Sequence, residues 1–194
     1  MLGIDRAGFV GEDGETHHGL FDVAMLTTVP GVTVYSPSDT AELSQCLEQA
    51  LYKDKGIVAV RYPRGCELYR SGTKAYSDFR HVSNKSRKLI FTYGRISAYA
   101  YTIHGVDVLQ AIKIFPIYDE IIDICLAYDE IYAFEEGERE GGIAQKLCTA
   151  LALAGFKGRF TITAVDGFVR HADVATQLHN AMLDADGMRK ITGE

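Results

Sequence analysis

Short apolar runs with strand character alternate with stretches of helical spacing along most of the chain, and this alternation limits the fold more than any other feature. Residues 57–62 form a continuous apolar run, as expected for a strand buried on both faces of a parallel sheet. Further strands are predicted at residues 32–36, 89–93, 106–109, 130–134 and 160–164. Because parallel strands need crossover connections, this order predicts an α/β fold with mostly parallel sheets.

Helices are marked by their starting residues and by apolar faces. After Pro37, leucine and alanine recur at helical spacing over residues 43–51, and Ser38 is the predicted N-cap. A second long helix is predicted to begin at Gly142, and a third around residues 174–183.

Two segments separate at a polar stretch without clear periodicity. We expect a first folded unit over residues 1–65, an interdomain linker over residues 66–87, and a second unit over residues 88–194. The second unit is expected to carry a mostly parallel sheet covered on both faces, which is a three-layer α/β/α domain.

Composition excludes several classes of function. The 194 residues carry a net charge of −6, which argues against broad binding to nucleic acid, because phosphates are neutralised by clustered Lys and Arg. No apolar run is long enough to span a bilayer and no secretory signal is visible, so a cytoplasmic protein without membrane contact is expected. The four cysteines form no close pair, and no structural metal is predicted.

The stretch with the most chemistry lies near the start of the chain. Residues 5–22 contain glycines at 8, 11, 14 and 19, and between them an arginine, several acids, a threonine and paired histidines. Such glycines permit close approach of the backbone to a ligand, and the polar residues could bind an anion and move protons. By composition alone, a glycine-rich surface turn with incidental polar residues explains the stretch about equally well.

As an ordered string, D-R-A-G-x-V-G-x-D-G-x-T-H-x-G-x-F-D, residues 5–22 resemble the signature of 1-deoxy-D-xylulose-5-phosphate synthases, which are transketolase-like thiamine-diphosphate enzymes. The resemblance continues through residues 36–39 and 60–65. It resumes at residues 92–94, 135–136, 141–142 and 183–188. It implies that residues 1–65 are the C-terminal half of a pyrimidine-binding α/β domain, and that residues 88–194 are a transketolase C-terminal domain.

The resemblance also implies a reaction and site residues. The family condenses pyruvate with glyceraldehyde 3-phosphate in non-mevalonate isoprenoid biosynthesis. Arg6 and Arg64 match arginines that hold the phosphate of the acceptor aldehyde, and Asp13 and His17 match catalytic residues that contact its carbonyl and hydroxyl groups. Without the resemblance, Arg64 would be interpreted as a strand-end arginine paired with a local acid. His18 is expected to be a bystander, because the family tolerates other residues there.

The cofactors that the resemblance implies are thiamine diphosphate and Mg²⁺, held in the full-length enzymes by an N-terminal domain with a G-D-G motif. That motif in its strand-to-helix context is missing here, and so is the activating glutamate, which lies upstream of the position matched by Met1. We therefore expect a C-terminal portion that binds neither cofactor and is inactive alone. Its expected partners are the missing N-terminal portion or a partner chain, and a second copy in a homodimer.

Two non-enzymatic alternatives remain open: an interaction subunit that completes a site with another polypeptide, and a catalytically silent scaffolding domain. One further acidic run is ambiguous. Glu135, Glu136 and Glu138 could hold a metal, but no neighbouring histidine or paired ligands accompany them. They are predicted to cap the following helix or to face solvent. His171 and Asp173 are predicted to be surface and capping residues.

Overall fold

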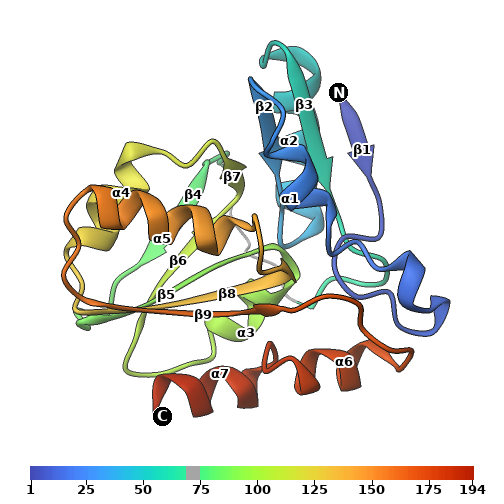
Figure 1. Ribbon diagram of the computed structural model, residues 1–194. Helices are drawn as coiled ribbons and strands as arrows, with labels where there is room; N and C mark the ends of the chain where they lie inside the picture. Colours follow the sequence, from blue (N-terminus) through green and yellow to red (C-terminus); the bar gives the residue numbers. More distant parts are fainter. Residues whose placement is uncertain (69–74) are drawn as a thin grey trace.

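The computed structural model describes residues 1–68 and 75–194, which form two β-sheets that meet along one side (Figure 1). The smaller sheet has the strand order β1-β3-β2-β7 and the larger one has the order β4-β6-β5-β8-β9. The strands of the smaller sheet are β1 (Leu2–Ile4), β2 (Val32–Tyr35), β3 (Ile57–Arg61) and β7 (Lys113–Phe115). Those of the larger sheet are β4 (Phe79–Val82), β5 (Lys88–Tyr93), β6 (Asp107–Ala111), β8 (Glu130–Glu138) and β9 (Arg159–Val165).

The smaller sheet is built from both segments of the chain. Strands β1, β3 and β2 are parallel, whereas β7 comes from the second segment and runs antiparallel to β2. The predicted strands at residues 32–36 and 57–62 are confirmed as β2 and β3. Strands β1 and β7 were not predicted, because three residues are too few to establish a periodic pattern.

Helices α1 (Asp22–Leu26) and α2 (Thr40–Tyr52) flank the smaller sheet. The prediction that Ser38 caps α2 is wrong: the Asp39 side chain accepts the amide N–H of Glu42 at 2.8 Å. Glu42 in turn accepts the backbone N–H and the hydroxyl of Ser38, at 2.9 and 2.8 Å. The carboxylate is the stronger acceptor at the positive helix end, and Ser38 serves the return contact.

The larger sheet confirms the expected α/β class. Strands β6, β5, β8 and β9 are parallel, and only β4 is antiparallel. Residues 79–82, which lie within the predicted linker, form β4 at the edge of this sheet, and residues 69–74 of that linker lie outside the described residues. A polar edge strand has the same composition as a linker, so its pairing partner decides its conformation.

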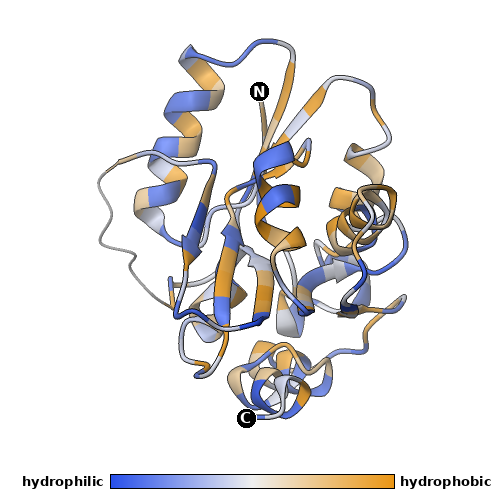
Figure 2. Ribbon diagram, turned by 90° about the vertical axis from the view of Figure 1, so that its left-hand side faces the viewer, coloured by the Kyte–Doolittle hydropathy of each residue, from blue (hydrophilic) through white to orange (hydrophobic). Residues whose placement is uncertain are grey.

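Helices cover both faces of the larger sheet, which gives three layers. One face carries α4 (Asp119–Leu126) and α5 (Ile143–Leu153), whose buried side chains pack with Leu89 and Phe91 of β5. The other carries η3 (Gly94–Ile96), α3 (Ser97–Ala100), α6 (Val174–Asn180) and α7 (Ala185–Thr192). The last two lie together along one side of the molecule (Figure 1). The hydropathy colouring shows mixed polar and apolar helix surfaces, as amphipathic helices require (Figure 2).

The two sheets share a hydrophobic core. The cluster that contains Leu89 and Phe91 of the larger sheet also contains Val34 and Ala59 of the smaller one, all at most 2% exposed. No helix among the described residues is long and apolar enough to cross a membrane.

Candidate anion site at the carboxyl ends of the strands

Residues 5–22 leave the end of β1, pass through two short 3₁₀ turns, η1 (Gly11–Asp13) and η2 (Glu15–His17), and return to α1. The two arms of this loop are joined by backbone hydrogen bonds between Gly8 and Gly19, at 2.8 and 2.9 Å. A Cβ atom on Gly19 would lie 2.3 Å from the carbonyl oxygen of Arg6, so only glycine allows the arms to come this close.

Three of the four predicted site residues converge on one point. The Oδ2 atom of Asp13 lies 3.3 Å from Nη1 of Arg6 and 2.5 Å from Nη1 of Arg64. Arg6 belongs to the loop after β1, and Arg64 to the turn after β3, which is the parallel neighbour of β1. Ligands of open α/β sheets gather at this edge, because the carboxyl ends of parallel strands meet there.

Electrostatics of this cluster favour the ionised carboxylate. The hydrogen bond from Arg64 holds the pKa of the Asp13 carboxyl below its ordinary value, and the positive charges of Arg64 and Arg6 act in the same direction. Arg64 is itself more than half exposed, with 56% of its side-chain surface open to solvent. An anion from solution can therefore reach the same guanidinium.

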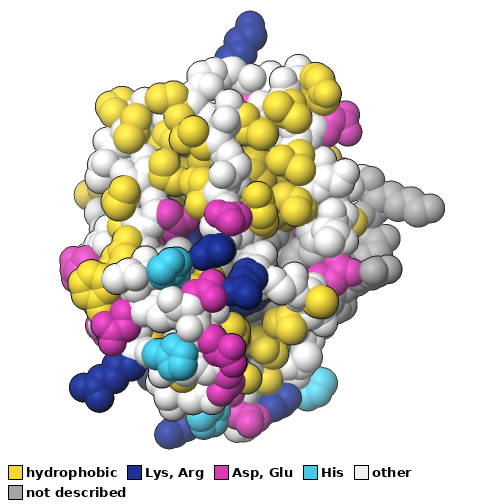
Figure 3. Space-filling view, turned by 90° about the vertical axis from the view of Figure 1, so that its right-hand side faces the viewer, with side chains coloured by type: hydrophobic (Ala, Val, Ile, Leu, Met, Phe, Trp, Pro, Cys, Tyr) yellow, Lys and Arg dark blue, Asp and Glu magenta, His cyan; other side chains and the backbone are white. Residues whose placement is uncertain are grey.

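The fourth predicted residue, His17, lies exposed on η2, where its Nδ1 is 3.2 Å from the hydroxyl of Thr16. Its charge is among the causes that lower the pKa of Asp13, so it is close to the cluster. Figure 3 shows cationic, acidic and histidine side chains side by side on this face of the molecule, below a broad apolar area.

His18 has a structural role in the loop. It is 8% exposed, its Nδ1 accepts the backbone N–H of Val10 at 3.0 Å, and its Nε2 contacts the Gln177 amide of α6 at 3.2 Å. Burial lowers the pKa of His18, because desolvation disfavours the imidazolium. These contacts do not connect His18 with a ligand. The expectation that His18 is a bystander in the reaction stays a prediction.

Behind the loop, a buried network joins the two segments. Arg61, at the end of β3, donates from Nε and Nη2 to the Asp22 carboxylate at 2.9 and 3.1 Å. Its guanidinium also lies over the Tyr93 ring, 5.7 Å from the centroid. The Tyr93 hydroxyl donates to Glu135 at 2.6 Å, so the contacts run from the loop to β8.

The role of the acidic run at the end of β8 was only partly predicted. The prediction that the run caps the following helix is confirmed for Glu135, which accepts the N–H groups of Ile143 and Ala144 of α5 at 2.9 and 2.8 Å. The alternative of facing solvent is wrong for Glu135 and for Glu136, which are 1% and 5% exposed. Burial raises the pKa of Glu135. Asp173 caps α6 and His171 is exposed, as predicted.

Sequence reasoning missed Arg95 and the role of Glu136, both of which contact the loop. Glu136 forms a buried ion pair with Arg95, which lies in η3 directly after β5. Arg95 gave no signal in the sequence because it stands within an apolar stretch, and its partner is 41 positions away.

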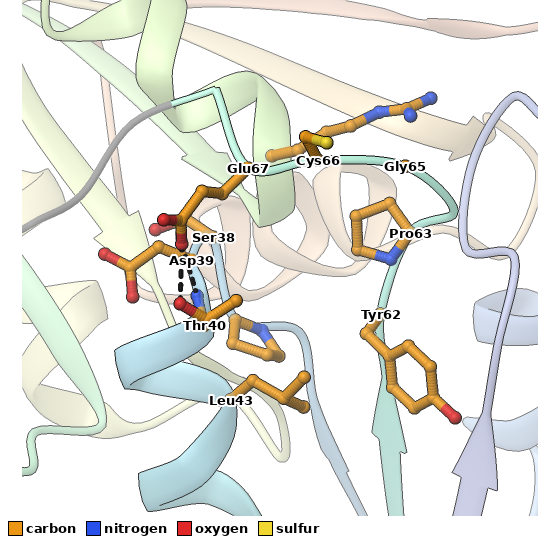
Figure 4. Close-up of a pocket in the computed structure, with 11 residues that line it drawn as sticks. Ser38, Asp39, Thr40, Leu43, Tyr62, Pro63, Gly65, Cys66 and Glu67 are labelled. Carbon is orange, nitrogen blue, oxygen red and sulfur yellow. Dashed lines mark hydrogen bonds between the residues drawn. The ribbon is translucent and has the colours of Figure 1, made fainter.

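A cavity of about 220 Å³ lies beside this site, between the start of α2 and the turn after β3 (Figure 4). Leu43, Tyr62 and Cys66 contribute to its walls. At its rim, Glu67 accepts the N–H and hydroxyl of Thr40 at 3.0 and 2.6 Å. A carboxylate already occupies the helix N-terminus there, so this cavity is a poor position for a phosphate.

The described residues do not fit the metal-bound part of thiamine diphosphate. Among residues 1–68 and 75–194, no three His, Cys, Asp or Glu side chains are grouped closely enough to hold a metal ion.

Comparisons with known proteins agree with this fold. Residues 1–67 match the family model "Transketolase, pyrimidine binding domain". The 1-deoxy-D-xylulose-5-phosphate synthases of Thermus thermophilus and Chlorobaculum tepidum are 33% and 35% identical, over 98% and 97% of this chain. The chain is similar to transketolase-like proteins. It resembles these synthases along nearly its whole length and covers 32% of each of them.

A solved structure, "Split gene transketolase, inactive beta4 tetramer", has the same fold, with a TM-score of 0.77 and 18% sequence identity. The match covers 95% of the present chain and 63% of the chain of the split-gene transketolase. The expected fold class is thereby confirmed for both segments.

Proposed function

We propose that Arg6 and Arg64 bind the phosphate of an acceptor aldehyde in a transferase of the 1-deoxy-D-xylulose-5-phosphate synthase type, which condenses pyruvate with glyceraldehyde 3-phosphate. The observation that carries this proposal is the convergence of two arginines from separate elements on a single carboxylate oxygen of Asp13. A phosphate oxygen can take the same position, and each guanidinium can donate paired hydrogen bonds to it.

In this proposal Asp13 has two positions. Without substrate it occupies the anion site, and an incoming phosphate displaces it toward the aldehyde end of the ligand. Because the two arginines lower its pKa, Asp13 is ionised at neutral pH and accepts hydrogen bonds there. We assign the adjacent His17 to proton transfer at the acceptor's carbonyl and hydroxyl groups, since an imidazole ring can both accept and donate a proton.

We propose that the remainder of the active site is supplied by polypeptide other than the described residues. The chain spans about a third of its curated relatives, and thiamine diphosphate would supply the carbanion-stabilising group of the reaction. We propose that the chain is inactive alone, and that the assembled enzyme acts in isoprenoid biosynthesis in the cytoplasm, as a homodimer or with a partner chain.

An interaction subunit is the second candidate, and one observation favours it. Strand β1 is the edge of the smaller sheet, and Leu2 on β1 and Ile57 on β3 are 48% and 45% exposed. An open strand edge beside apolar side chains is suited to pairing with another polypeptide. Both candidates use the same four site residues, and they differ in whether the rest of the active site belongs to the same polypeptide or to a separate one.

Ligand binding to the chain itself tests the anion site. Inorganic phosphate and glyceraldehyde 3-phosphate should bind in a calorimetric titration, and pyruvate should not. Arg64→Ala should weaken phosphate binding about tenfold, which corresponds to one lost charge-assisted contact. Asp13→Asn should strengthen it severalfold, because the competing carboxylate is gone.

The matched control is Arg87→Ala, which removes another exposed arginine paired with an aspartate, Asp129, away from this site. Equal losses in the Arg64 and Arg87 variants would mean that phosphate binds only through general charge. A folded chain that binds no phosphate would favour the scaffolding alternative.

A further inference from the structure

Two charged side chains of the second segment hold a single residue of the loop. Glu136 lies on β8 and Arg95 follows β5, and these strands are parallel neighbours, so both side chains emerge at the same edge of the larger sheet. The Nε atom of Arg95 donates to Oε2 of Glu136 at 2.9 Å, and Nη2 contacts Oε1. Both side chains are only 7% exposed.

The residue they hold is Phe9. Its backbone N–H donates to Oε1 of Glu136 at 2.8 Å, and its carbonyl oxygen accepts from Nη2 of Arg95 at 2.8 Å. The Phe9 ring is fully buried in the core that also contains Ile90 and Phe134 of the larger sheet. Both polar backbone groups and the side chain of one residue are therefore fixed by the second segment.

The neighbouring residue confirms how closely the ion pair approaches the loop. A Cβ atom on Gly8 would lie 2.3 Å from the carboxyl group of Glu136, and the φ angle of Gly8 is +78°. Only glycine satisfies both conditions, because a side chain would collide with the carboxylate and would be strained at this φ.

Phe9 is three positions from Arg6 and four from Asp13, so the position of Phe9 constrains the positions of Arg6 and Asp13. Arg6 has a φ angle of +61°, a left-handed conformation that a non-glycine residue keeps only where its surroundings enforce it. Arg64 belongs to a different element, the turn after β3. The distance between the two guanidinium groups therefore depends on how the loop is anchored.

We propose that Arg95 and Glu136 are positioning residues of the anion site: by clamping Phe9 they keep Arg6 close enough to Arg64 for one anion to contact both. This inference rests on the proposed function of the arginine pair. A buried ion pair is seldom a net source of stability compared with apolar side chains. An apolar pair, however, could not bind the N–H and the carbonyl of the same residue at once.

The test compares Arg95→Gln with Arg80→Gln. Arg80 also forms a largely buried, cross-segment pair with a glutamate, Glu42, at 2.8 Å between Nε and Oε1, but it holds no residue of the loop. Two measurements are made on the 194-residue chain: hydrogen exchange of the Gly8 to Val10 amides, and the dissociation constant for inorganic phosphate.

Arg95→Gln should accelerate exchange of these amides about tenfold or more, and should weaken phosphate binding about tenfold. Arg80→Gln should leave both within about twofold of the parent while lowering the melting temperature. If the two variants behave alike in both measurements, Arg95 acts only on stability and the proposal is overturned.

The conservative variant Glu136→Gln keeps the shape of the side chain and one oxygen for the Phe9 N–H. It should give an intermediate acceleration of exchange, and it decides the matter if Arg95→Gln fails to fold. Should the parent chain bind no phosphate at all, the proposed function fails, whereas the exchange measurements still decide whether the clamp exists.

Discussion

The two sheets of this chain differ in how much of their support is their own. The larger sheet has five strands, all from residues 79–165, and helices on both faces. The smaller sheet borrows β7 from the second segment, and its first residue after β2, Ser36, donates its N–H to Ile112 at 2.8 Å. The sheet with the site residues is therefore the dependent one.

The individual hydrogen bonds of the loop at residues 5–22 show the same dependence on the second segment. Phe9 is held by Arg95 and Glu136, Val10 by His18, and the carbonyl of Leu20 by the N–H of Glu138 at 2.8 Å. Of the four residues that hold the loop, Arg95, Glu136 and Glu138 belong to the second segment, and His18 contacts Gln177 of that segment. The second segment thus determines the geometry of a site to which it contributes none of the four predicted ligand-binding side chains.

The largest difference between the two sheets is expected when the two segments are separated. A polypeptide of residues 75–194 should retain a cooperative unfolding transition, because its sheet keeps helices on both faces. Residues 1–68 alone should show none, since β7 and much of the shared core are then lost. Circular dichroism during heating would measure both. A folded 1–68 polypeptide would contradict the dependence described here.

Two glycine substitutions test how firmly the ion pair between Arg95 and Glu136 holds the loop. Gly8 and Gly31 have nearly the same φ angles, +78° and +75°, but a Cβ atom on Gly8 meets the Glu136 carboxyl group at 2.3 Å, whereas one on Gly31 meets nothing within 4 Å. Gly31→Ala should cost about 1 kcal/mol from backbone strain alone. Gly8→Ala should cost about 3 kcal/mol or more, because the collision adds to the strain.

Urea unfolding of the two variants would give these free energies. Equal losses for Gly8→Ala and Gly31→Ala would show that the ion pair yields easily, and the loop would then not be firmly clamped.

The smallest expected effect concerns pH. Because the pKa of His18 is lowered on folding, the folded chain binds fewer protons than the unfolded chain below the ordinary histidine pKa of about 6.5. The stability associated with neutral His18 is therefore present above that pH and is lost as the pH falls toward the lowered value. Melting temperatures between about pH 5 and pH 8 should show this decline.

His18→Gln should flatten the decline, and the exposed His171→Gln should leave it unchanged. If both variants keep the slope of the parent, other groups are responsible and the contact with Val10 does not depend on the protonation of His18.

Much of the architecture could be predicted from local patterns. The strands β2, β3, β5, β6, β8 and β9 correspond to runs of four or more residues that are rich in apolar and β-branched side chains. Helices α2, α5 and α6 have periodic faces or clear starts. The three-residue strands and the polar strand β4 could not be found this way. Their conformation comes from hydrogen bonds to a neighbour that is distant in sequence.

The sequence by itself determined the α/β class, the alternation of strands and helices, and the ordered string at residues 5–22 with its candidates Arg6, Asp13, His17 and Arg64. These features are local, so chain spacing and residue chemistry are enough to specify them. Only the tertiary structure decided that Asp13 bridges the two arginines, and that Arg95 and Glu136 clamp Phe9. Except for the contact of Arg6 with Asp13, these contacts join residues that are 51 to 127 positions distant in the sequence. They therefore depend on how the two sheets meet.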